Sequence, residues 1–302
     1  MSSKIYFNTA GGLNLRRRAT NLITRAYHRM APSHAVNTAR KLLLTPEKII
    51  KQAEQPDGMR IKAIQSTEGS LMTYALGDGP VWLLGHGWSG SASQFFPLME
   101  KIAAAGFTAL AFDNPAHGNS EGQYGHLPGF VKGLEAVIDQ DVEELAGVVA
   151  HSMGCTMVLE SKHPKLAGKP MFLIAPVLNY RDNLYRMVDV SGFSLRLFRD
   201  VVGEIEQQYQ YPIDTVDTFA RLSEHQGKVL IVHDVSDRFA QIEQSRDANA
   251  LNHVELIETE GLGHSRILSS QAVLDAFDVI SPSALSWHRI SSISLQQFQI
   301  ER

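Results

Sequence analysis

From residue 57 onwards, short apolar runs alternate with stretches in which apolar residues recur every three or four positions. The runs are typical of buried strands and the periodic stretches of amphipathic helices. This alternation predicts an α/β fold, with a mostly parallel central sheet and helices on both faces. The expected strands are 59–66, 71–76, 81–85, 107–112, 145–150, 171–175, 229–232 and 254–257, and the helices between them include 95–105, 131–144 and 155–161.

One stretch departs from this alternation. Residues 177–226 contain no convincing strand and place Leu, Met, Phe and Val at helical spacing. A helical insertion between two strands would lie over the carboxyl edge of the sheet, where open α/β folds bind ligands. We therefore expect a small helical cap; a helical crossover with no role in substrate access is the alternative. The expected organisation is an N-terminal arm at 1–56, a core at 57–176 and 227–280, the cap at 177–226 and a C-terminal tail at 281–302.

The N-terminal arm has an unusual charge pattern. Its first 46 residues contain no Asp or Glu but include eight Lys and Arg residues. Apolar residues recur among these charges at roughly helical spacing, at Leu15, Leu22, Ile23, Ala26 and Met30. We expect a helical arm packed on the body of the protein with a basic outer face. Attachment to an anionic membrane surface is the second interpretation, and an Arg-rich transit peptide is the third.

Composition narrows the class of protein. Hydrophobic residues make up 44% of the 302 positions and charged residues 20%, as in an ordinary soluble protein. The net charge of −4 does not favour a nucleic-acid partner, and the single cysteine, Cys155, excludes an internal disulfide framework. No run is apolar enough to span a bilayer, and no secretory signal is evident. We expect a cytoplasmic protein, with peripheral membrane contact through the arm as the open alternative.

Two segments fit a pattern in which a serine is flanked by small residues. Residues 118–122 match Gly-x-Ser-x-Gly literally around Ser120, whereas residues 150–154 have Ala in the first position. An exposed nucleophile on a sharp turn needs a strand before it and a helix directly after it. Ser120 has a loop on both sides, but Ser152 lies between a predicted strand and a predicted helix. We therefore predict Ser152 as the nucleophile, at a helix N-terminus that favours developing negative charge.

A nucleophilic serine needs a base, and the base needs an acid to orient it. In hydrolases that place the serine on such a turn, the acid and then the histidine follow it along the chain. Asp237 follows strand 229–232, and His264 lies in a Gly-containing loop after strand 254–257. Both therefore lie at the same sheet edge as Ser152, and we predict these three residues to be catalytic. The alternatives are Asp234, Asp182, His253 and His288.

A reacting carbonyl group also needs two N–H donors for its developing oxyanion. One is expected from the backbone of Met153, directly after the nucleophile. The other is expected from the backbone of Trp88, in the loop that follows strand 81–85. His86 and Gly87 support this loop. Because His86 precedes the serine along the chain, we expect it to order the loop by hydrogen bonding rather than to act in catalysis.

These features together resemble the α/β-hydrolase superfamily over about residues 59–280. The segments that carry the resemblance are 83–88, 113–120, 150–154, 232–239 and 263–265, in that order. They depart from the usual pattern in having Ala at 116, 150 and 240. Asp234 stands where Gly is usual. It is expected to cap its loop, and as a second carboxylate near Asp237 it is expected to raise one pKa.

The resemblance implies acyl transfer through an acyl-enzyme, with hydrolysis of a small-molecule carboxylic ester as the leading reaction. Thioesterase, peptidase or amidase, and C–C hydrolase activities are alternatives on the same fold. A non-catalytic ligand-binding or scaffold protein is the alternative of another class. A serine nucleophile argues against haloalkane and epoxide chemistry. No metal or organic cofactor is expected, since the sequence has no H-E-x-x-H, phosphate-loop or dinucleotide motif.

Overall fold

The structure is a computed structural model, and it describes residues 14–47 and 54–281. One eight-stranded sheet crosses the molecule in the order β1-β2-β4-β3-β5-β6-β7-β8, and β2 alone runs antiparallel to its neighbours. This confirms the predicted α/β class and its mostly parallel sheet. The strands are β1 (Arg60–Ser66), β2 (Gly69–Leu76), β3 (Val81–Gly85), β4 (Thr108–Phe112), β5 (Leu145–His151), β6 (Met171–Ile174), β7 (Val229–Asp234) and β8 (Val254–Thr259).

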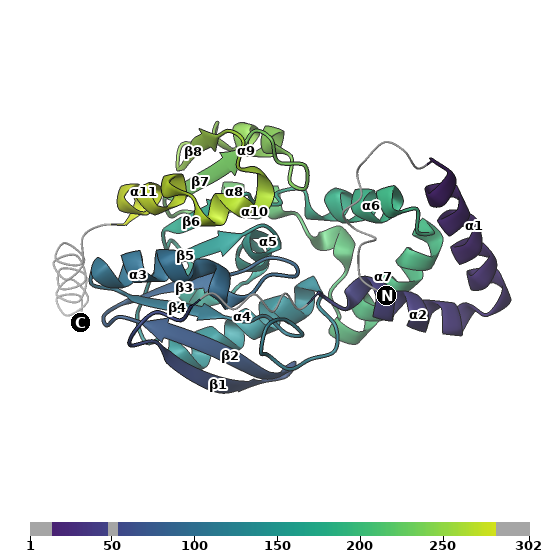
Figure 1. Ribbon diagram of the computed structural model, residues 1–302, viewed down its shortest axis with the longest axis horizontal. Coiled ribbons are helices and arrows are strands. Elements are labelled where there is room, and N and C mark those ends of the chain that lie inside the picture. Colours follow the sequence, from purple (N-terminus) through teal and green to yellow (C-terminus); the bar gives the residue numbers. More distant parts are fainter. Residues whose placement is uncertain (1–13, 48–53, 282–302) are drawn as a thin grey trace, which may run out of the picture.

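Helices cover both faces of this sheet (Figure 1). One face packs on α3 (Phe96–Ala104) and α11 (Gln271–Ile280), whose buried side chains share an apolar cluster with Trp82 and Phe172. The other face packs on α4 (Leu127–Asp141), α5 (Met153–Glu160), α8 (Thr218–Glu224) and α9 (Ile242–Ala248). Because β3, β5, β6 and β7 are buried along their whole length, they are apolar rather than alternating, except at the carboxyl ends of β5 and β7, which carry His151, His233 and Asp234.

The helix expected at 131–144 begins four residues earlier, at Leu127, and ends at Asp141. Pro128 lies in the first turn of this helix, where proline is tolerated because its missing N–H needs no partner. His126 caps this turn, since its Nδ1 accepts a hydrogen bond from Gly129 N at 3.0 Å. His126 and Pro128 therefore mark the start of α4 rather than a loop.

Helices α6 (Tyr180–Ser191) and α7 (Leu195–Tyr209) extend beyond the carboxyl edge of the sheet, at the right of Figure 1. The short helix α8 falls within the stretch expected as cap, yet Leu222 of α8 is buried with the core. It packs on α5 and covers a sheet face. The helical layer over the edge therefore consists of α6 and α7 together with a contribution from the N-terminal arm.

The arm forms α1 (Asn14–Met30) and α2 (Pro32–Leu44), and it packs on the cap rather than on the sheet. Helix α2 buries Val36, Ala39 and Leu43 against Phe198 and Val201 of α7. Helix α1 differs from the expected basic outer face, because the apolar residues of its outer face are exposed between arginines. No helix within residues 14–47 and 54–281 is long and apolar enough to cross a bilayer.

Candidate active site

Ser152 lies on the turn between β5 and α5. Its backbone has φ 55° and ψ −122°, a left-handed conformation that is strained for any residue with a side chain. A Cβ atom at Gly154 would lie 2.4 Å from the carbonyl oxygen of Gly85. Glycine at 154 thus lets the first turn of α5 approach β3 closely, and the turn pushes the serine side chain out at the sheet edge.

The structure brings the three predicted catalytic side chains together in one chain of hydrogen bonds. Ser152 Oγ lies 2.8 Å from His264 Nε2. On the other side of the ring, His264 Nδ1 lies 2.6 Å from Asp237 Oδ2. A carboxylate can only accept here, so Nδ1 carries the proton and Nε2 is left as the acceptor for the serine hydroxyl. This tautomer is the one a general base requires.

Asp237 is held by donors on both of its oxygens. Its Oδ1 accepts from the backbone of Phe239 at 2.7 Å and of Ala240 at 3.1 Å. Burial raises the pKa of Asp237, but hydrogen bonds from His233 and His264 outweigh it, and the resulting pKa lies below the usual range. The acid is therefore ionised and oriented before any substrate binds.

His233 is a supporting residue that the sequence reasoning missed. Its Nε2 lies 3.3 Å from Asp237 Oδ2 and 3.2 Å from the carbonyl oxygen of Ala240. Both of these atoms are acceptors, so Nε2 carries the proton, while Nδ1 lies 2.7 Å from the hydroxyl of Ser245. The available signal was a histidine at the end of an apolar strand, four residues before the acid.

His151 is a second residue without a predicted role. Its ring packs on that of His264 with a centroid separation of 4.8 Å, and its Nε2 lies 2.9 Å from the His264 carbonyl oxygen. Burial, followed by the proximity of His264, lowers the pKa of His151 to about 3. A neutral imidazole that donates to this carbonyl group helps to fix the loop that carries the base.

Asp234 caps a loop, as expected, and does not touch the base. Its carboxylate accepts from Ser236 N, Thr259 Oγ1 and Leu262 N, each at 2.9 Å. The expectation that one of the two neighbouring carboxylates would have a raised pKa is wrong. Burial raises the pKa of Asp234, yet backbone N–H groups of the loop before His264 lower it further, so its net pKa is also depressed. Separate sets of donors stabilise the two charges.

Ser120, Asp182 and His253 form structural contacts away from the nucleophile. Ser120 Oγ donates to Asp113 O at 2.7 Å and accepts from Met72 N at 2.9 Å, which ties a loop to β2. Asp182 pairs with Arg181 at the surface, and His253 contacts the carbonyl oxygen of Leu222. His288 lies outside the described residues, as does most of the tail expected at 281–302. The literal Gly-x-Ser-x-Gly motif is thus a loop anchor.

The loop after β3 lies directly against the nucleophile. A Cβ atom at Gly87 would come within 2.8 Å of Ser152 Cβ and 3.3 Å of its Oγ. His86 is fully buried and orders this loop, since its Nε2 accepts from Asn114 N at 2.9 Å and its Nδ1 donates to Gly87 O at 2.7 Å. Burial, the largest influence, lowers the pKa of His86 and keeps it neutral.

The two expected oxyanion donors flank this serine. Trp88 follows Gly87 in the loop and lines the same cavity as Ser152. Met153 is the first residue of α5, so its N–H has no carbonyl group one turn earlier in the helix to bind. The next residue of the loop, Ser89, has φ 54° and donates its N–H to His117 Nε2 at 3.0 Å. This contact fixes the direction of the loop backbone.

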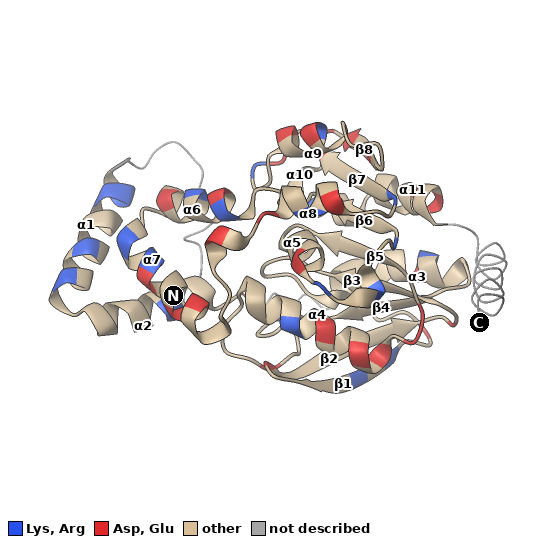
Figure 2. Cartoon of the chain, turned by 180° about the vertical axis from the view of Figure 1, so that it is seen from behind, with Lys and Arg blue, Asp and Glu red and all other residues tan. Residues whose placement is uncertain are grey.

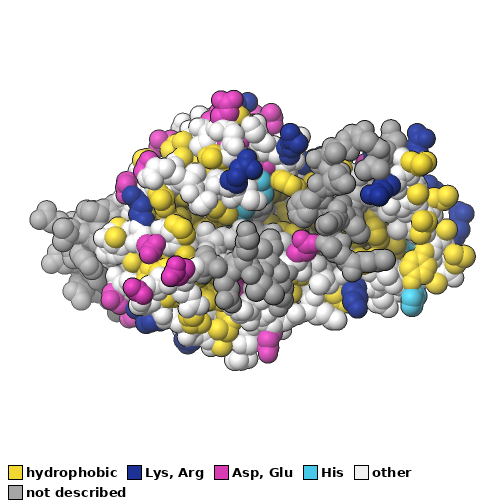
Figure 3. Space-filling model, viewed as in Figure 1, with side chains coloured by type: hydrophobic (Ala, Val, Ile, Leu, Met, Phe, Trp, Pro, Cys, Tyr) yellow, Lys and Arg dark blue, Asp and Glu magenta, His cyan; other side chains and the backbone are white. Residues whose placement is uncertain are grey.

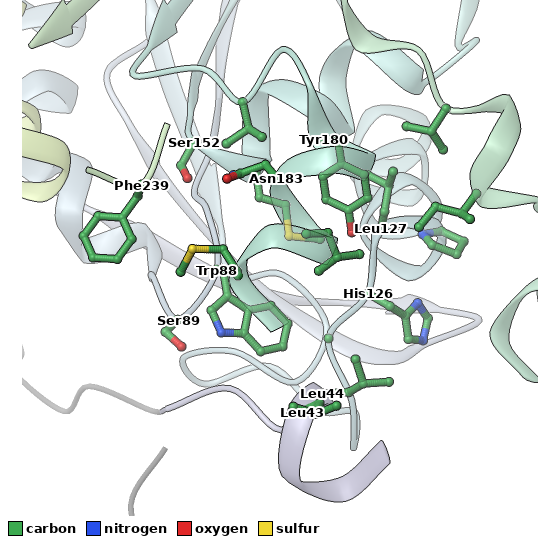
Figure 4. Close-up of a pocket in the computed structure, with 18 of the residues that line it drawn as sticks. Leu43, Leu44, Trp88, Ser89, His126, Leu127, Ser152, Tyr180, Asn183 and Phe239 are labelled. Atoms are coloured by element: carbon green, nitrogen blue, oxygen red, sulfur yellow. The ribbon is translucent and has the colours of Figure 1, made fainter. Parts of the chain in front are cut away.

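A cavity of about 370 Å³ lies between the sheet edge and the helical layer. Figure 4 shows Trp88, Tyr180 and Leu44 arranged around the same space as Ser152. The walls are mostly apolar and come from three parts of the chain: Trp88 and Leu127 from the core, Leu184 and Met187 from the cap, and Leu43 and Leu44 from the arm. The sequence assigned the arm no part in this cavity.

Within the described ranges, no group of three or more His, Cys, Asp or Glu side chains is placed to hold a metal ion. The described site residues are those of acid–base and nucleophilic chemistry: a serine hydroxyl, an imidazole within hydrogen-bond distance of it, and an ionised carboxylate that orients the imidazole. The arrangement can take the proton of Ser152 at His264 Nε2 and stabilise the resulting imidazolium through Asp237.

A sheet of this order, with a serine on the turn after β5, defines the hydrolase fold that the sequence resembled. The chain belongs to the Alpha/beta hydrolase family, whose sequence model matches residues 82–276. A comparison with curated proteins gives no match.

Solved structures agree on the fold. An esterase of Pyrococcus furiosus, Pf2001, superimposes with a TM-score of 0.55 at 18% identity, over 78% of this chain and 93% of that one. Est1E of Butyrivibrio proteoclasticus, with ferulic acid bound, gives 0.56 at 16% identity, over 72% and 98%. A thioesterase domain from the curacin biosynthetic pathway gives 0.54 at 16% identity, over 73% and 99%.

Proposed function

We propose that the protein is a serine hydrolase that cleaves small carboxylic esters through an acyl-enzyme. The observation that carries the proposal is the hydrogen-bonded series at the sheet edge. Ser152 Oγ is 2.8 Å from His264 Nε2, and His264 Nδ1 is 2.6 Å from Asp237 Oδ2. The strained backbone of Ser152 supports the same role, because such strain persists where the position of a side chain matters to function.

In the first half of the reaction, Ser152 Oγ attacks the ester carbonyl carbon while His264 Nε2 takes the hydroxyl proton. The carbonyl oxygen becomes an oxyanion, and the backbone N–H groups of Trp88 and Met153 donate to it. Asp237 stabilises the imidazolium. When the intermediate collapses, the alcohol leaves with the proton from His264 Nε2, and the acyl group stays on the serine. Water then repeats these steps and releases the acid.

The cavity supports an apolar substrate. A volume of about 370 Å³ with mostly apolar walls suits an uncharged acyl or alcohol group. An ester has such groups on both sides of its carbonyl carbon, and its alcohol is a better leaving group than an amine. The esterase activity named for the Pyrococcus furiosus protein supports the same class, on a common fold.

The first experiment labels the purified protein with a fluorophosphonate probe, which reacts with activated serines. We expect wild type and Ser120→Ala to be labelled and Ser152→Ala to stay unlabelled. Ser120 serves as the control because it belongs to the literal motif yet holds only backbone groups. Correctly folded wild-type protein that does not react with the probe would contradict the proposal and favour a non-catalytic binding role.

The second experiment separates reaction types. The values of kcat/KM are compared for p-nitrophenyl esters, matched thioesters and aminoacyl anilides. We expect the esters to be preferred, since the mostly apolar walls suit uncharged groups on both sides of the carbonyl carbon, whereas an aminoacyl anilide carries a charged amine. A preference for the thioesters would assign the protein to the thioesterases instead.

A further inference from the structure

Helix α1 packs on the protein in the opposite sense to an ordinary surface helix. Six apolar residues lie within an arc of about 100° on the helix, the width of a typical core-facing stripe. In α1 this stripe faces outwards. Leu15, Leu22, Ile23 and Met30 are each at least 65% exposed, and the two alanines between them are also exposed. We refer to Leu15, Ala19, Leu22, Ile23, Ala26 and Met30 as the α1 stripe.

Polar side chains make the contacts of α1 with the cap. Thr24 is buried, and its Oγ1 accepts a hydrogen bond from Ser194 N at 3.1 Å. Arg17 donates to both the backbone and the carboxylate of Asp189, at 3.0 Å and 2.6 Å. His28 Nε2 lies 2.8 Å from Asp200 Oδ2. These contacts fix the rotation of the helix, so the outward direction of the stripe is built into the fold.

A close backbone contact fixes the same orientation. Gly192 follows α6 with φ 82°, and a Cβ atom there would lie 2.7 Å from the carbonyl oxygen of Arg17. Only a glycine allows this approach. The contact, together with the buried Thr24, argues that α1 is seated specifically against the cap rather than lying loosely on it.

Charge accompanies the stripe. Helix α1 contains five arginines and no acidic residue. By helical geometry, Arg16 borders the stripe on one side and Arg18, Arg25 and Arg29 border it on the other, and all four are exposed. Figure 2 shows blue but no red residues along α1, and Figure 3 shows yellow side chains at this end of the molecule between dark-blue ones.

We infer that α1 docks on the surface of an anionic lipid bilayer. An apolar face flanked by arginines is the pattern of helices that lie in a membrane interface, where the apolar face enters the acyl boundary and the arginines bind the headgroups. A second copy of this chain fits the stripe less well. Symmetric pairing through the stripe would bring the four arginines that border it in each copy against those of the other, with no acidic residue in the helix to offset them.

The arm also connects this surface to the active-site cavity. Only Ala31 separates α1 from α2, and α2 spans about 20 Å before it ends at the cavity. Leu43 and Leu44 at that end line the cavity together with Ser152. Docking of α1 would therefore hold the cavity near the membrane surface, where apolar esters concentrate. The binding itself does not depend on the proposed reaction.

The test is sedimentation of the full-length protein with lipid vesicles, without substrate. One set contains phosphatidylcholine alone and the other contains about one third phosphatidylserine. We expect binding to the anionic set at low salt, and weaker binding to the neutral set and at high salt. The double substitution Leu22→Glu/Ile23→Glu should weaken binding to anionic vesicles by at least about tenfold, since it removes two apolar groups that enter the bilayer and adds repulsion.

Two further variants complete the test. Replacing Arg16, Arg18, Arg25 and Arg29 with Gln should weaken binding to anionic vesicles by at least about tenfold. The weak binding to neutral vesicles should not change. Ile61→Glu/Val279→Glu is the matched control, because these residues are 44% and 48% exposed and lie on β1 and α11, away from the arm. The control should bind like wild type. All variants should keep the wild-type rate of ester hydrolysis in solution, since none alters the site.

Several outcomes would overturn the inference. Wild-type protein that binds neither set of vesicles would do so, as would equal loss of binding in the control. Sedimentation velocity tests the alternative that a second copy of this chain covers the α1 stripe. If wild type is a dimer that Leu22→Glu/Ile23→Glu converts to a monomer, the α1 stripe is an interface between copies of this chain rather than a membrane surface.

Discussion

The sheet edge and the helical layer above it line the same cavity but are fixed by different forces. At the edge, Ser152 is held in a strained conformation and the Asp237 side chain is completely buried among hydrogen-bond donors. In the layer, Leu184 and Met187 face the cavity through apolar contacts and are only half-buried. The edge specifies the position of single atoms, whereas the layer specifies a shape.

This difference has a consequence for substitutions. Hydrogen bonds and backbone contacts lose their effect when an atom moves by an ångström, so changes at the edge should abolish the reaction while the fold survives. Apolar walls adapt to small changes, so substitutions in the layer should alter which substrate fits and by a smaller factor. The two regions can therefore be separated by pairs of matched substitutions.

The largest effect is expected at the acid. Asp237→Asn removes the charge that holds His264 in its reactive tautomer, and kcat should fall by about 10⁴-fold with little change in KM. The matched control is Asp234→Asn, a buried carboxylate that bonds to Leu262 N and Thr259 rather than to the base. It should keep kcat within about tenfold of wild type. Similar losses of kcat in both variants would contradict the assigned roles.

Two glycine-to-alanine substitutions, one in each region, compare how strongly catalysis depends on the backbone of the sheet edge and of the helical layer. Gly87→Ala places a methyl group 2.8 Å from Ser152 Cβ, so the loop or the serine must move, and kcat should fall by roughly 10²-fold, the size of a lost oxyanion contact. Gly203 lies inside α7, where an added Cβ meets no atom within 4 Å. Gly203→Ala should leave kcat unchanged.

The stability of these glycine variants is measured by urea denaturation. Gly203→Ala should raise the free energy of unfolding by about 0.5–1 kcal/mol, because alanine loses less backbone entropy in a helix. If kcat fell as much in Gly203→Ala as in Gly87→Ala, catalysis would depend on the exact backbone position of the cap as strongly as on that of the sheet edge.

The edge was largely predictable from the sequence, and the reason is local. Apolar strands end in loops that carry Trp88, Asp237 and His264, and parallel strands bring such loops to one side. Ser152 was separated from Ser120 by what precedes and follows it, not by the motif. The role of His233 was not predicted, because its contact with Asp237 depends on the conformation of the turn between the two residues.

The helical layer was less predictable. Periodicity identifies an apolar face but not what covers it. The arm was expected to pack on the body of the protein, yet α2 buries its apolar face and α1 exposes it. What distinguishes them are contacts between residues about 170 positions apart, such as that of Thr24 with Ser194. The end of the cap was also misplaced, because the packing of α8 on α5 leaves no local signal.

A histidine between the two regions should make stability depend on pH. His126 caps α4 and its ring packs on Tyr209 of α7. Burial, and then the positive charge of Arg40, lowers the pKa of His126 to about 4 from its ordinary value near 6.5. Because the folded state resists protonation, this contribution to stability is complete above pH 6.5 and is lost progressively as the pH falls towards 4.

The loss attributable to His126 between pH 7.5 and pH 5 is about 2 kcal/mol of unfolding free energy. His126→Asn keeps a side chain that can cap α4 but does not titrate. Urea denaturation gives the free energy of unfolding at each pH. Between pH 7.5 and pH 5 this free energy should fall by about 2 kcal/mol less in the variant than in wild type. An identical pH dependence in the variant and in wild type would mean that the His126 ring is solvated in the folded protein. Water would then reach the contact between α4 and α7.

The smallest effect is expected in the wall of the layer itself. Leu184→Trp adds bulk to a side chain that faces the cavity, and the remaining space should exclude long acyl groups but not short ones. For p-nitrophenyl octanoate, kcat/KM should fall by about tenfold, while the value for the acetate should stay within about twofold of wild type. Val190→Trp lies on the same helix but is exposed, and it should change neither value. If Leu184→Trp instead reduced both esters equally, the added bulk would be acting on the catalytic geometry, and the layer would share the exacting character of the edge.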